Sequence, residues 1–435
     1  MKRLIFYWNQ LKSTFWFVPI VFICVAICLA FAMLYIDSQI KFTVNAYTQY
    51  MFAGSAESAR SILSTISGAM IGVAGTVFSI TLVGLSLAST QFGPRLVKNF
   101  MYDRFNQIVL GTYIATFAYC LLVLNTINEN DSITFIPVLS IIFALMAALA
   151  NIILLVFFIH HISTSIQADT VIADLSASLA RQIKTIFPES IGEAEPERKI
   201  LDEEAYKSSY KNQCDLRAQH SGYLQYIDSD ALLDFAMEKD GLIELYKRPG
   251  DYVVANALIA KLYLDEEMEK EEIQRLRGKF ITGKTRTHEQ DAEHAIHQMV
   301  EVAARALSPG VNDPYTAISC IDNLTSILCY LAKTPFPSKY RKDKNDELRV
   351  ITDTFTFDGM VDAAFNQIRQ FSENSPAVVI RLMESFDTLI DFTQNETQVR
   401  TIQRHAHMVL NMAKRSFKEE NDLEDLIKRS QKVLG

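Results

Sequence analysis

The stretch Ser61–Thr90 reads SILSTISGAMIGVAGTVFSITLVGLSLAST and contains no Asp, Glu, Lys or Arg. It lies in a charge-free run of 34 residues, Ser61–Pro94. An α-helix needs about 20 apolar residues to cross about 30 Å of hydrocarbon, so this run is long enough to span a membrane. Seventeen of the 30 quoted residues are Gly, Ala, Ser or Thr. The stretch therefore predicts a transmembrane helix with many small side chains.

This helix is predicted to have two different faces, because side chains three and four residues apart lie on one side of a helix. The small-residue stripe consists of Ser61, Thr65, Gly68, Gly72, Gly75, Ser79, Val83, Ser86 and Thr90. The opposite face consists of Leu63, Ile66, Met70, Val73, Val77, Ile80 and Leu87. We expect this second, apolar face to contact lipid.

Two interpretations of the small-residue stripe remain open. Small residues let helix backbones approach closely, and Gly68 and Gly72 have the Gly-x-x-x-Gly spacing that is typical of helix packing. Alternatively, a Gly/Ser/Thr face repeated around a symmetry axis could line a narrow water-filled pathway. No charged residue interrupts the span, which argues against a proton relay or a charged selectivity ring inside it.

Three further charge-free runs flank this stretch: Ser13–Ile36 with 24 residues, Phe105–Asn128 with 24 and Ser132–Ala168 with 37. A soluble protein could bury one such helix, but four in succession indicate a polytopic membrane protein. We predict a transmembrane domain over residues 1–162, with spans at about 15–36, 64–90, 107–127 and 133–159.

Basic residues are distributed unevenly between the two sides of the membrane. Lys2, Arg3 and Lys12 precede the first span, Arg95, Lys98 and Arg104 follow the second, and the opposite side has only Lys41 and Arg60. Because short basic segments stay in the cytoplasm, we expect the N-terminus and the whole C-terminal region to be cytoplasmic.

Residues 163–435 have a different composition from the membrane domain. They contain 34 Lys/Arg and 45 Asp/Glu, a net charge of −11, against 8 and 5, a net charge of +3, in residues 1–162. The whole composition argues against a secreted disulfide scaffold, a typical soluble enzyme and a nucleic-acid-binding protein. Cys214, Cys320 and Cys329 form no C-x-x-C pair, so a thiolate zinc site is not expected.

The pattern of residues 163–435 predicts an α+β cytoplasmic domain. We expect a connecting helix and an acidic linker over 163–204, a β-containing unit over 205–288 and a mainly helical unit over 289–435. The strand predictions are Tyr223–Ile227, Leu242–Tyr246, Tyr252–Leu264 and Leu348–Phe357, with a helix near Asp230–Lys239.

Gly278–Thr285 satisfies the phosphate-loop pattern G-x-x-x-x-G-K-[ST]. A phosphate loop leaves a buried strand and enters a helix at its Lys-Thr. Here a charged helical pattern, Glu271–Arg277, precedes the match, and Phe280-Ile281 inside it has the character of a strand. The context therefore argues against nucleotide hydrolysis.

The predicted helix Glu289–Leu307 carries Asp291, His294, His297 and Glu301 on one face. His294 and His297, with an acidic residue one turn away on each side, could hold a divalent metal ion. The simpler interpretation, which we favour, is a solvated polar face on an amphipathic helix.

Ser308–Pro314 reads SPGVNDP and predicts a turn at Pro309-Gly310, a helix cap at Asp313 and a first helical residue at Pro314. This structural account covers every residue except Asn312. Asn312 and Asp313 are therefore candidate binding residues of a cytoplasmic loop.

Three stretches carry a family resemblance: Ser79–Arg95, Leu110–Tyr113 and Arg305–Pro314. They resemble the bacterial predicted membrane proteins catalogued as domain of unknown function 2254, and the similarity extends over most of the chain. The resemblance implies an inner-membrane location but no established activity, cofactor or active site. It also implies that Ser308–Pro314 is a signature of the family, whereas His294, His297 and the Lys284-Thr285 pair are not family features.

We expect an oligomeric channel or transport-like protein of the bacterial inner membrane, with a cytoplasmic domain that gates or senses. The stripe residues Ser61, Thr65, Gly68, Gly72, Gly75, Ser79 and Ser86 are the pore or helix-packing candidates. The alternative is a non-conducting sensor or scaffold that binds a ligand or partner, and a nucleotide or metal enzyme is third. We expect no enzymatic activity, no cofactor and no nucleic acid; the expected partners are lipid, further copies of the chain and an unidentified ion or small molecule.

Overall fold

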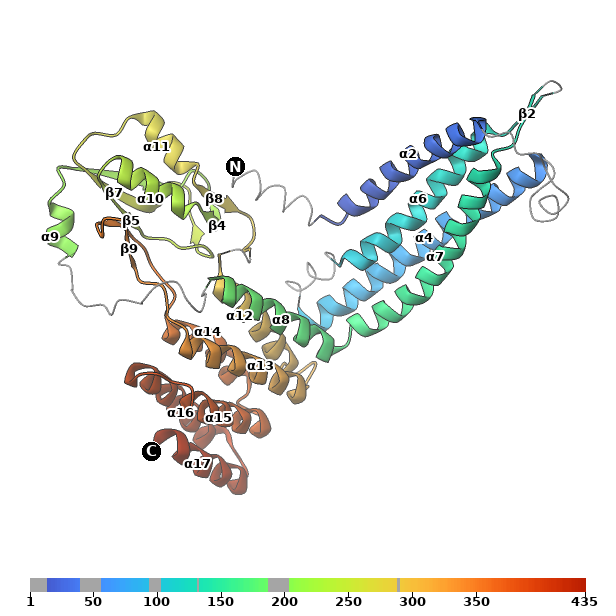
Figure 1. Cartoon of the computed structure of the whole chain (residues 1–435). Coiled ribbons are helices and arrows are strands. Elements are labelled where there is room, and N and C mark those ends of the chain that lie inside the picture. The colour runs from blue at the N-terminus through green and yellow to red at the C-terminus, as the bar shows by residue number, and fades with distance from the viewer. Residues whose placement is uncertain (1–13, 40–55, 94–102, 131–132, 187–202, 288–289) are drawn as a thin grey trace. The chain divides into compact units, whose positions relative to one another are not determined.

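The computed structural model describes residues 14–39, 56–93, 103–130, 133–186, 203–287 and 290–435. The chain divides into two compact units, Met1–Thr170 and Val171–Gly435, whose elements are labelled in Figure 1. Most of the predicted acidic linker, and Lys2, Lys41 and Arg95 among the residues that predict orientation, lie outside the described residues.

The first unit consists mainly of four helices: α2 (Phe17–Gln39), α4 (Ala56–Phe92), α6 (Arg104–Thr126) and α7 (Val138–Ser165). All four are long and apolar enough to cross a membrane, which confirms the four predicted spans. Helix α4 begins earlier than predicted and has 37 residues. Its length is about 55 Å, so it is longer than the hydrocarbon layer is thick. A short antiparallel hairpin, β1 (Asn128–Asn130) and β2 (Ile133–Phe135), joins α6 to α7.

Helix α6 is the central helix of this unit. Its span is 56% buried, whereas the spans of α2, α4 and α7 are 17–28% buried. Val109, Tyr113 and Val123 of α6 pack with Leu63, Ile66, Met70 and Val77 of α4 and with Ala144 and Phe158 of α7. Gly111 permits the close approach of α2, because a Cβ atom there would lie 3.2 Å from the Cα of Pro19.

The second unit contains most of the amphipathic helix α8 (Ala168–Ile186) and two sheets. The larger sheet has the strand order β3 (Asn212–Arg217), β7 (Leu258–Leu264), β5 (Leu242–Leu245), β10 (Leu348–Ile351) and β9 (Tyr340–Lys342). Only β5 and β10 are parallel. The smaller sheet is antiparallel and has the order β6 (Tyr252–Val253), β4 (Gly222–Ile227) and β8 (Phe280–Gly283).

Short helices accompany the sheets: α9 (Glu203–Ser208), α10 (Ser229–Glu238) and α11 (Lys270–Arg277). Leu232 and Phe235 of α10 pack on Leu216, Leu224 and Leu262 of the strands to form one core. Of the strand predicted at Leu348–Phe357, only Leu348–Ile351 form β10, and Phe357 begins a helix. Strand β10 joins residues distant in sequence to the sheet through β5. The strands β3 and β9 were not predicted, whereas the strand character of Phe280-Ile281 is confirmed by β8.

The rest of the unit is helical, as predicted: α12 (Ala292–Ala306), α13 (Pro314–Lys333), α14 (Phe357–Phe371), α15 (Pro376–Ile390), α16 (Glu396–Ser416) and α17 (Glu420–Leu434). Helix α12 packs against α13 and α14, and α15 packs against α13, α16 and α17. Phe365 and Phe386 meet edge to face in this core, with ring centroids 5.2 Å apart. The helical layer is therefore a continuous packed body rather than a set of separate hairpins.

Candidate functional site

The small-residue stripe of α4 faces outward from its four-helix unit. All nine stripe residues are exposed, and a Cβ atom placed on Gly68, Gly72 or Gly75 would meet no atom within 4 Å. Four of the seven residues predicted to contact lipid are buried instead: Leu63, Ile66, Met70 and Val77 lie in the core of the unit. For these residues the prediction was wrong, because α4 packs them on α6. The small residues lie outside, together with five large apolar residues that are 42–60% exposed: Ile71, Phe78, Leu82, Val83 and Leu87.

Three hydroxyl groups of the stripe, those of Thr65, Ser79 and Thr90, have hydrogen-bond acceptors within the helix. Thr65 Oγ1 donates to the Ser61 carbonyl at 2.7 Å, and Ser79 Oγ donates to the Gly75 carbonyl at 2.9 Å. Next to the stripe, Thr76 Oγ1 donates to the Gly72 carbonyl at 3.2 Å. Such back-bonded hydroxyls leave no free donor, so the face can lie against another helix or against water.

The other outer surfaces of the unit have a different character. Exposed residues of α2 include Val25 and Phe31, and those of α7 include Met146, Ile153 and Phe157, with 58–65% of each residue accessible. These bulky apolar surfaces suit lipid chains. The exposed glycines and hydroxyls of α4 bury little apolar area against lipid, and they allow a helix backbone to come close instead.

Two polar groups buried in the first unit were not predicted. The Asp37 carboxylate accepts hydrogen bonds from the Leu139 and Ser140 amides at 2.9 and 3.0 Å, and it thereby caps the N-terminus of α7. Asn151 Nδ2 donates to Thr116 Oγ1 at 2.9 Å, and the Asn151 carbonyl accepts from Tyr113 Oη at 2.6 Å. Each group is satisfied inside the unit, so both hold helices together. Their partners are 35–103 residues away in sequence, and no local pattern reveals them.

Helix α12 does not have the solvated polar face that was predicted. Asp291 and His294 are 1% and 8% exposed. Four residues of the helix are partly exposed, and the others are buried. The Asp291 carboxylate is held by Arg286 through two hydrogen bonds of 2.6 and 2.7 Å. Arg286 Nη1 lies 3.2 Å from His297 Nδ1. These charges are paired with one another, because the β-containing part of the unit covers the beginning of α12.

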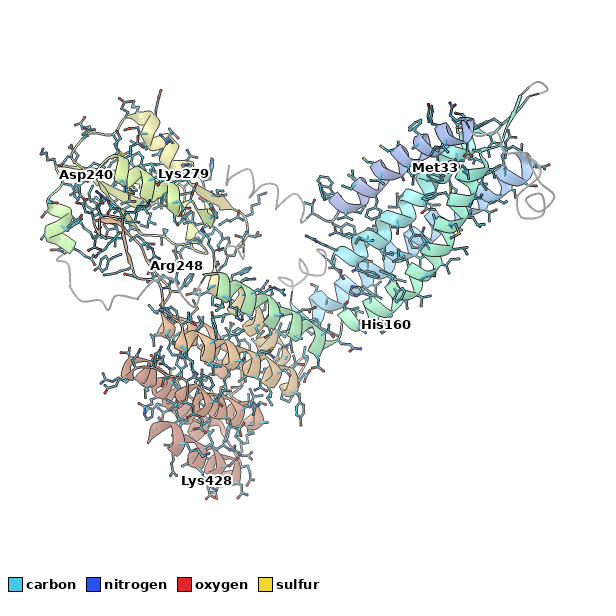
Figure 2. The ribbon with its side chains drawn as sticks, viewed as in Figure 1. Met33, His160, Asp240, Arg248, Lys279 and Lys428 are labelled. Carbon is cyan, nitrogen blue, oxygen red and sulfur yellow. The ribbon has the colours of Figure 1, made fainter. Side chains whose placement is uncertain are left out.

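The turn Arg248–Asp251 completes this junction. Arg248, labelled in Figure 2, forms an ion pair of 2.6 Å with Glu293. Burial raises the pKa of Glu293, and the charge of Arg248 opposes that effect. Gly250 has a φ of +101°, and a Cβ there would lie 2.4 Å from Asp291 Oδ2, so only glycine fits. Within the described residues no group of three His, Cys, Asp or Glu side chains could hold a metal ion, and His294 and His297 belong to the junction instead.

The phosphate-loop match does not have the backbone of a phosphate loop. Gly278 caps the C-terminus of α11, and Phe280–Gly283 form β8, which pairs with β4. The amides that a phosphate loop would present to phosphate are therefore part of a sheet. The order here is helix, then strand, the reverse of a strand that enters a helix.

The loop Ser308–Pro314 has the predicted caps. Asp313 Oδ1 accepts from the Thr316 amide at 3.1 Å, and Pro314 is the first residue of α13. Asn312 has a φ of +50°, in the left-handed region that Asn and Gly tolerate best. The geometry thus accounts for Asn312 without a ligand, and the binding role of Asn312 and Asp313 stays a prediction.

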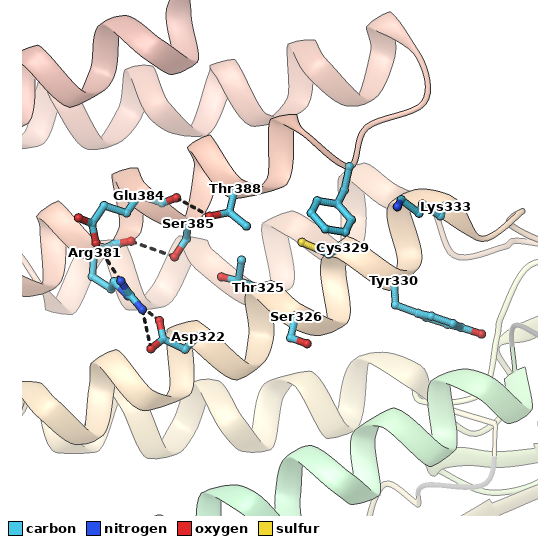
Figure 3. Close-up of a pocket in the computed structure, with 11 residues that line it drawn as sticks. Asp322, Thr325, Ser326, Cys329, Tyr330, Lys333, Arg381, Glu384, Ser385 and Thr388 are labelled. Carbon is cyan, nitrogen blue, oxygen red and sulfur yellow. Dashed lines mark hydrogen bonds and ion pairs between the residues drawn. The ribbon is translucent and has the colours of Figure 1, made fainter.

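A groove of about 570 Å³ runs between α13 and α15 (Figure 3). Its lining residues are Asp322, Thr325, Ser326, Cys329, Tyr330, Lys333, Arg381, Glu384, Ser385, Thr388 and Phe392. Arg381 donates two hydrogen bonds of 2.6 and 2.9 Å to Asp322 at one end, and Lys333 lies at the other end. The Lys333 ammonium lies 4.3 Å from the centroid of the Phe392 ring.

The groove has the size of a small-molecule site, and both polar and apolar side chains line it. Thr325, Ser385 and Thr388 each donate to a carbonyl one turn back, so their oxygens remain available only as acceptors. Burial raises the pKa of Cys329, which keeps its thiol protonated at neutral pH. The groove was not predicted, because its two walls lie about 60 residues apart and meet only in the folded unit.

The comparisons with known proteins agree with the four apolar helices of the first unit. The family described as predicted membrane protein (DUF2254) matches residues 12–388. An uncharacterized protein of Mycobacterium tuberculosis, MT1328, is 32% identical over 377 residues, which cover 86% of this chain and 71% of the relative. Uncharacterized protein Mb1321c of Mycobacterium bovis has the same identity and coverage. No solved structure matches the chain. The length of the family match and the identity to these relatives show that the chain belongs to the predicted membrane protein family DUF2254.

Proposed function

We propose that the protein is an oligomeric channel or transport-like membrane protein whose copies meet along the small-residue stripe of α4. The observation that carries the proposal is the outward position of Gly68, Gly72 and Gly75 on a unit whose core is complete without them. A face of small residues gains little from lipid chains, but it gains close packing or a polar lining when it meets another helix.

The partner of this face is a second copy of the same chain. The stripe carries no Asp, Glu, Lys or Arg between Arg60 and Arg95, so copies of it can approach one another without charge repulsion. Repeated around an axis, the same stripe would place hydroxyl oxygens and glycine backbone along a shared conduit. In such an assembly, small residues at the sides of the stripe would pack against the neighbouring copy, and those at its centre would line the conduit.

The native mass of the complex in mild detergent is the first test. Single cysteines at Gly72 and Ser79, in a background without the native cysteines, should then react with a water-soluble thiol reagent. Cysteines at Met70 and Val77, which face the core, and at Met146, on the lipid-like surface of α7, are the matched controls. A monomeric mass, or protection at both stripe positions, would contradict a shared conduit.

We also propose that the protein lies in the bacterial inner membrane with both termini and the second unit in the cytoplasm. The excess of Lys and Arg around the N-terminus and between the second and third spans supports this orientation. Alkaline phosphatase, which is active only outside the cytoplasm, should be inactive when fused after residue 435. It should be active when inserted between residues 40 and 55, and the opposite result would reverse the topology.

A second candidate function is a non-conducting, membrane-anchored sensor or scaffold. The groove between α13 and α15 favours it, because a cavity of about 570 Å³ with paired charges and hydroxyls suits a small ligand. Filling the groove with a Ser326→Trp substitution tests this function. If no flux is measured, and metabolite mixtures raise the unfolding temperature of the unmodified protein but not of the variant, the sensor would replace the channel.

A further inference from the structure

A small recess lies where β4, β7 and the end of α11 meet. Its floor is apolar, because Leu224, Val253 and Ile259 are 1–3% exposed. Its rim is polar and carries two arginines: the remaining lining residues are Arg217, Ala218, Gln219, His220, Arg277, Phe280 and Thr282. Phe280 and Thr282 come from the stretch that matches the phosphate-loop pattern.

Arg217 and Arg277 differ in their partners. Arg217 donates to Asp215 at 2.7 Å and to the Asn256 carbonyl at 3.2 Å. Arg277 has no ion pair with a carboxylate in the part of the chain that the structure describes, and its buried Nε has no hydrogen-bond acceptor there. A buried guanidinium N–H without an acceptor is destabilising. Arg277 therefore brings to the lining of the recess a positive charge that no carboxylate of the described residues neutralises.

The acceptor that suits this rim is a tetrahedral oxyanion. The guanidinium of Arg277 presents a planar fork of donors, and Arg217, His220 and Thr282 lie around the same recess. Donors from several directions match the three oxygens of a phosphate better than the two oxygens of a carboxylate. The recess offers only about 30 Å³, and one water needs about 10–15 Å³, so a single anionic group can enter and the rest of a ligand must stay outside.

We propose that this recess binds a phosphate group, either on a soluble phosphate compound or on a lipid headgroup. The recognition differs from that of a phosphate loop, because β8 uses its backbone to pair with β4 and leaves side chains to hold the anion. This inference is independent of the proposed channel, since it requires neither self-association nor a conduit.

The test uses the full-length protein in a detergent with a neutral headgroup. Unfolding temperature is measured against inorganic phosphate and against dihexanoyl phosphatidic acid, with chloride at the same ionic strength as the reference. At least one phosphate probe should stabilise the unmodified protein. Arg277→Gln should weaken this effect at least 10-fold, whereas Arg275→Gln, an exposed arginine of the same helix, should leave it unchanged.

The two probes distinguish the sources of the phosphate group. Stabilisation by both probes indicates a soluble ligand, and stabilisation by the lipid alone indicates a headgroup. If Arg277→Gln does not fold, Thr282→Val replaces it, and a loss of several-fold in affinity is expected. The proposal is overturned if neither probe stabilises the unmodified protein, or if the Arg277 and Arg275 variants respond equally.

Discussion

At the scale of single residues, the ion pairs of the second unit differ in burial, and burial decides what each contributes. The side chain of Asp291 is 2% exposed and that of its partner Arg286 is 21% exposed, whereas Asp322 and Arg381 are 39% and 41% exposed. Arg286→Gln leaves a buried carboxylate without its counter-charge, which costs roughly 3–5 kcal/mol. Arg381→Gln removes a solvent-screened pair and should cost less than about 1 kcal/mol.

Thermal unfolding of the two variants in detergent measures this difference. The Arg286 variant should unfold at a temperature lower by roughly 5–15 °C, and the Arg381 variant by less than about 3 °C. Equal shifts would show that the junction at the beginning of α12 contributes no more to stability than a surface ion pair.

His405 gives the stability of the helical layer a defined pH dependence. Its side chain is fully buried against Phe365 and Phe386, and its Nε2 lies 2.9 Å from Asp362 Oδ1. Burial lowers the pKa of His405, and Asp362 and Asp358 oppose the shift while Arg404 adds to it. The pKa of a histidine in the unfolded chain is about 6.5, so below that pH the unfolded chain binds the proton more readily and stability falls.

The unfolding temperature should therefore be highest above about pH 6.5 and fall as the pH is lowered toward the folded pKa of His405. His405→Gln should make this fall shallower. His407→Gln, an exposed histidine of the same helix, should keep the slope of the unmodified protein. If both variants keep that slope, His405 is not the group responsible.

At the scale of elements, the turn between α12 and α13 depends on one backbone conformation. Asn312 has a φ of +50°, and Asp313 caps α13. Asn312→Gly should leave the unfolding temperature almost unchanged, whereas Asn312→Val, which is β-branched, should cost about 1–3 kcal/mol. Loss of stability in the Gly variant would contradict this account. A Gly variant that is stable but inactive in flux would instead revive the predicted binding role.

The elements also show which features the sequence could predict. Charge-free runs predicted all four membrane helices, because crossing hydrocarbon demands length and composition that few other structures need. The sequence periodicity of α4 showed that the helix has two faces, but not which of them packs on the core. In lipid the surrounding solvent is itself apolar, so either face can be the packed one. The orientation of α4 was decided by the fit of Leu63 and Met70 against α6.

Features that need distant partners were out of reach. The polar residues of α12 were expected in water, but Arg286 and Arg248 reach them from the segment before the helix and from a turn more than 40 residues away. The groove requires α13 and α15 to lie side by side. The strands β3 and β9 are short and partly polar, and they are strands only because they pair with β7 and β10.

At the scale of the whole molecule, substitutions at two glycines distinguish the folding of the first unit from its assembly into an oligomer. A Cβ on Gly72 would meet no atom within 4 Å, whereas a Cβ on Gly111 would lie 3.2 Å from Pro19 Cα and 3.4 Å from Phe22. Gly72→Leu should therefore fold with an unchanged unit. Gly111→Leu should push α2 away from α6 and lower the unfolding temperature, since overpacking typically costs about 1–3 kcal/mol.

If copies of the chain meet along the stripe, Gly72→Leu should reduce the native mass of the complex in mild detergent to that of the monomer. The same substitution should keep the unfolding temperature of a monomeric unit, because its side chain projects away from the core. An unchanged oligomer would show that the copies meet elsewhere and that the stripe faces lipid. If the unmodified protein is itself a monomer, no axial conduit can form, and the groove between α13 and α15 becomes the place to look for function.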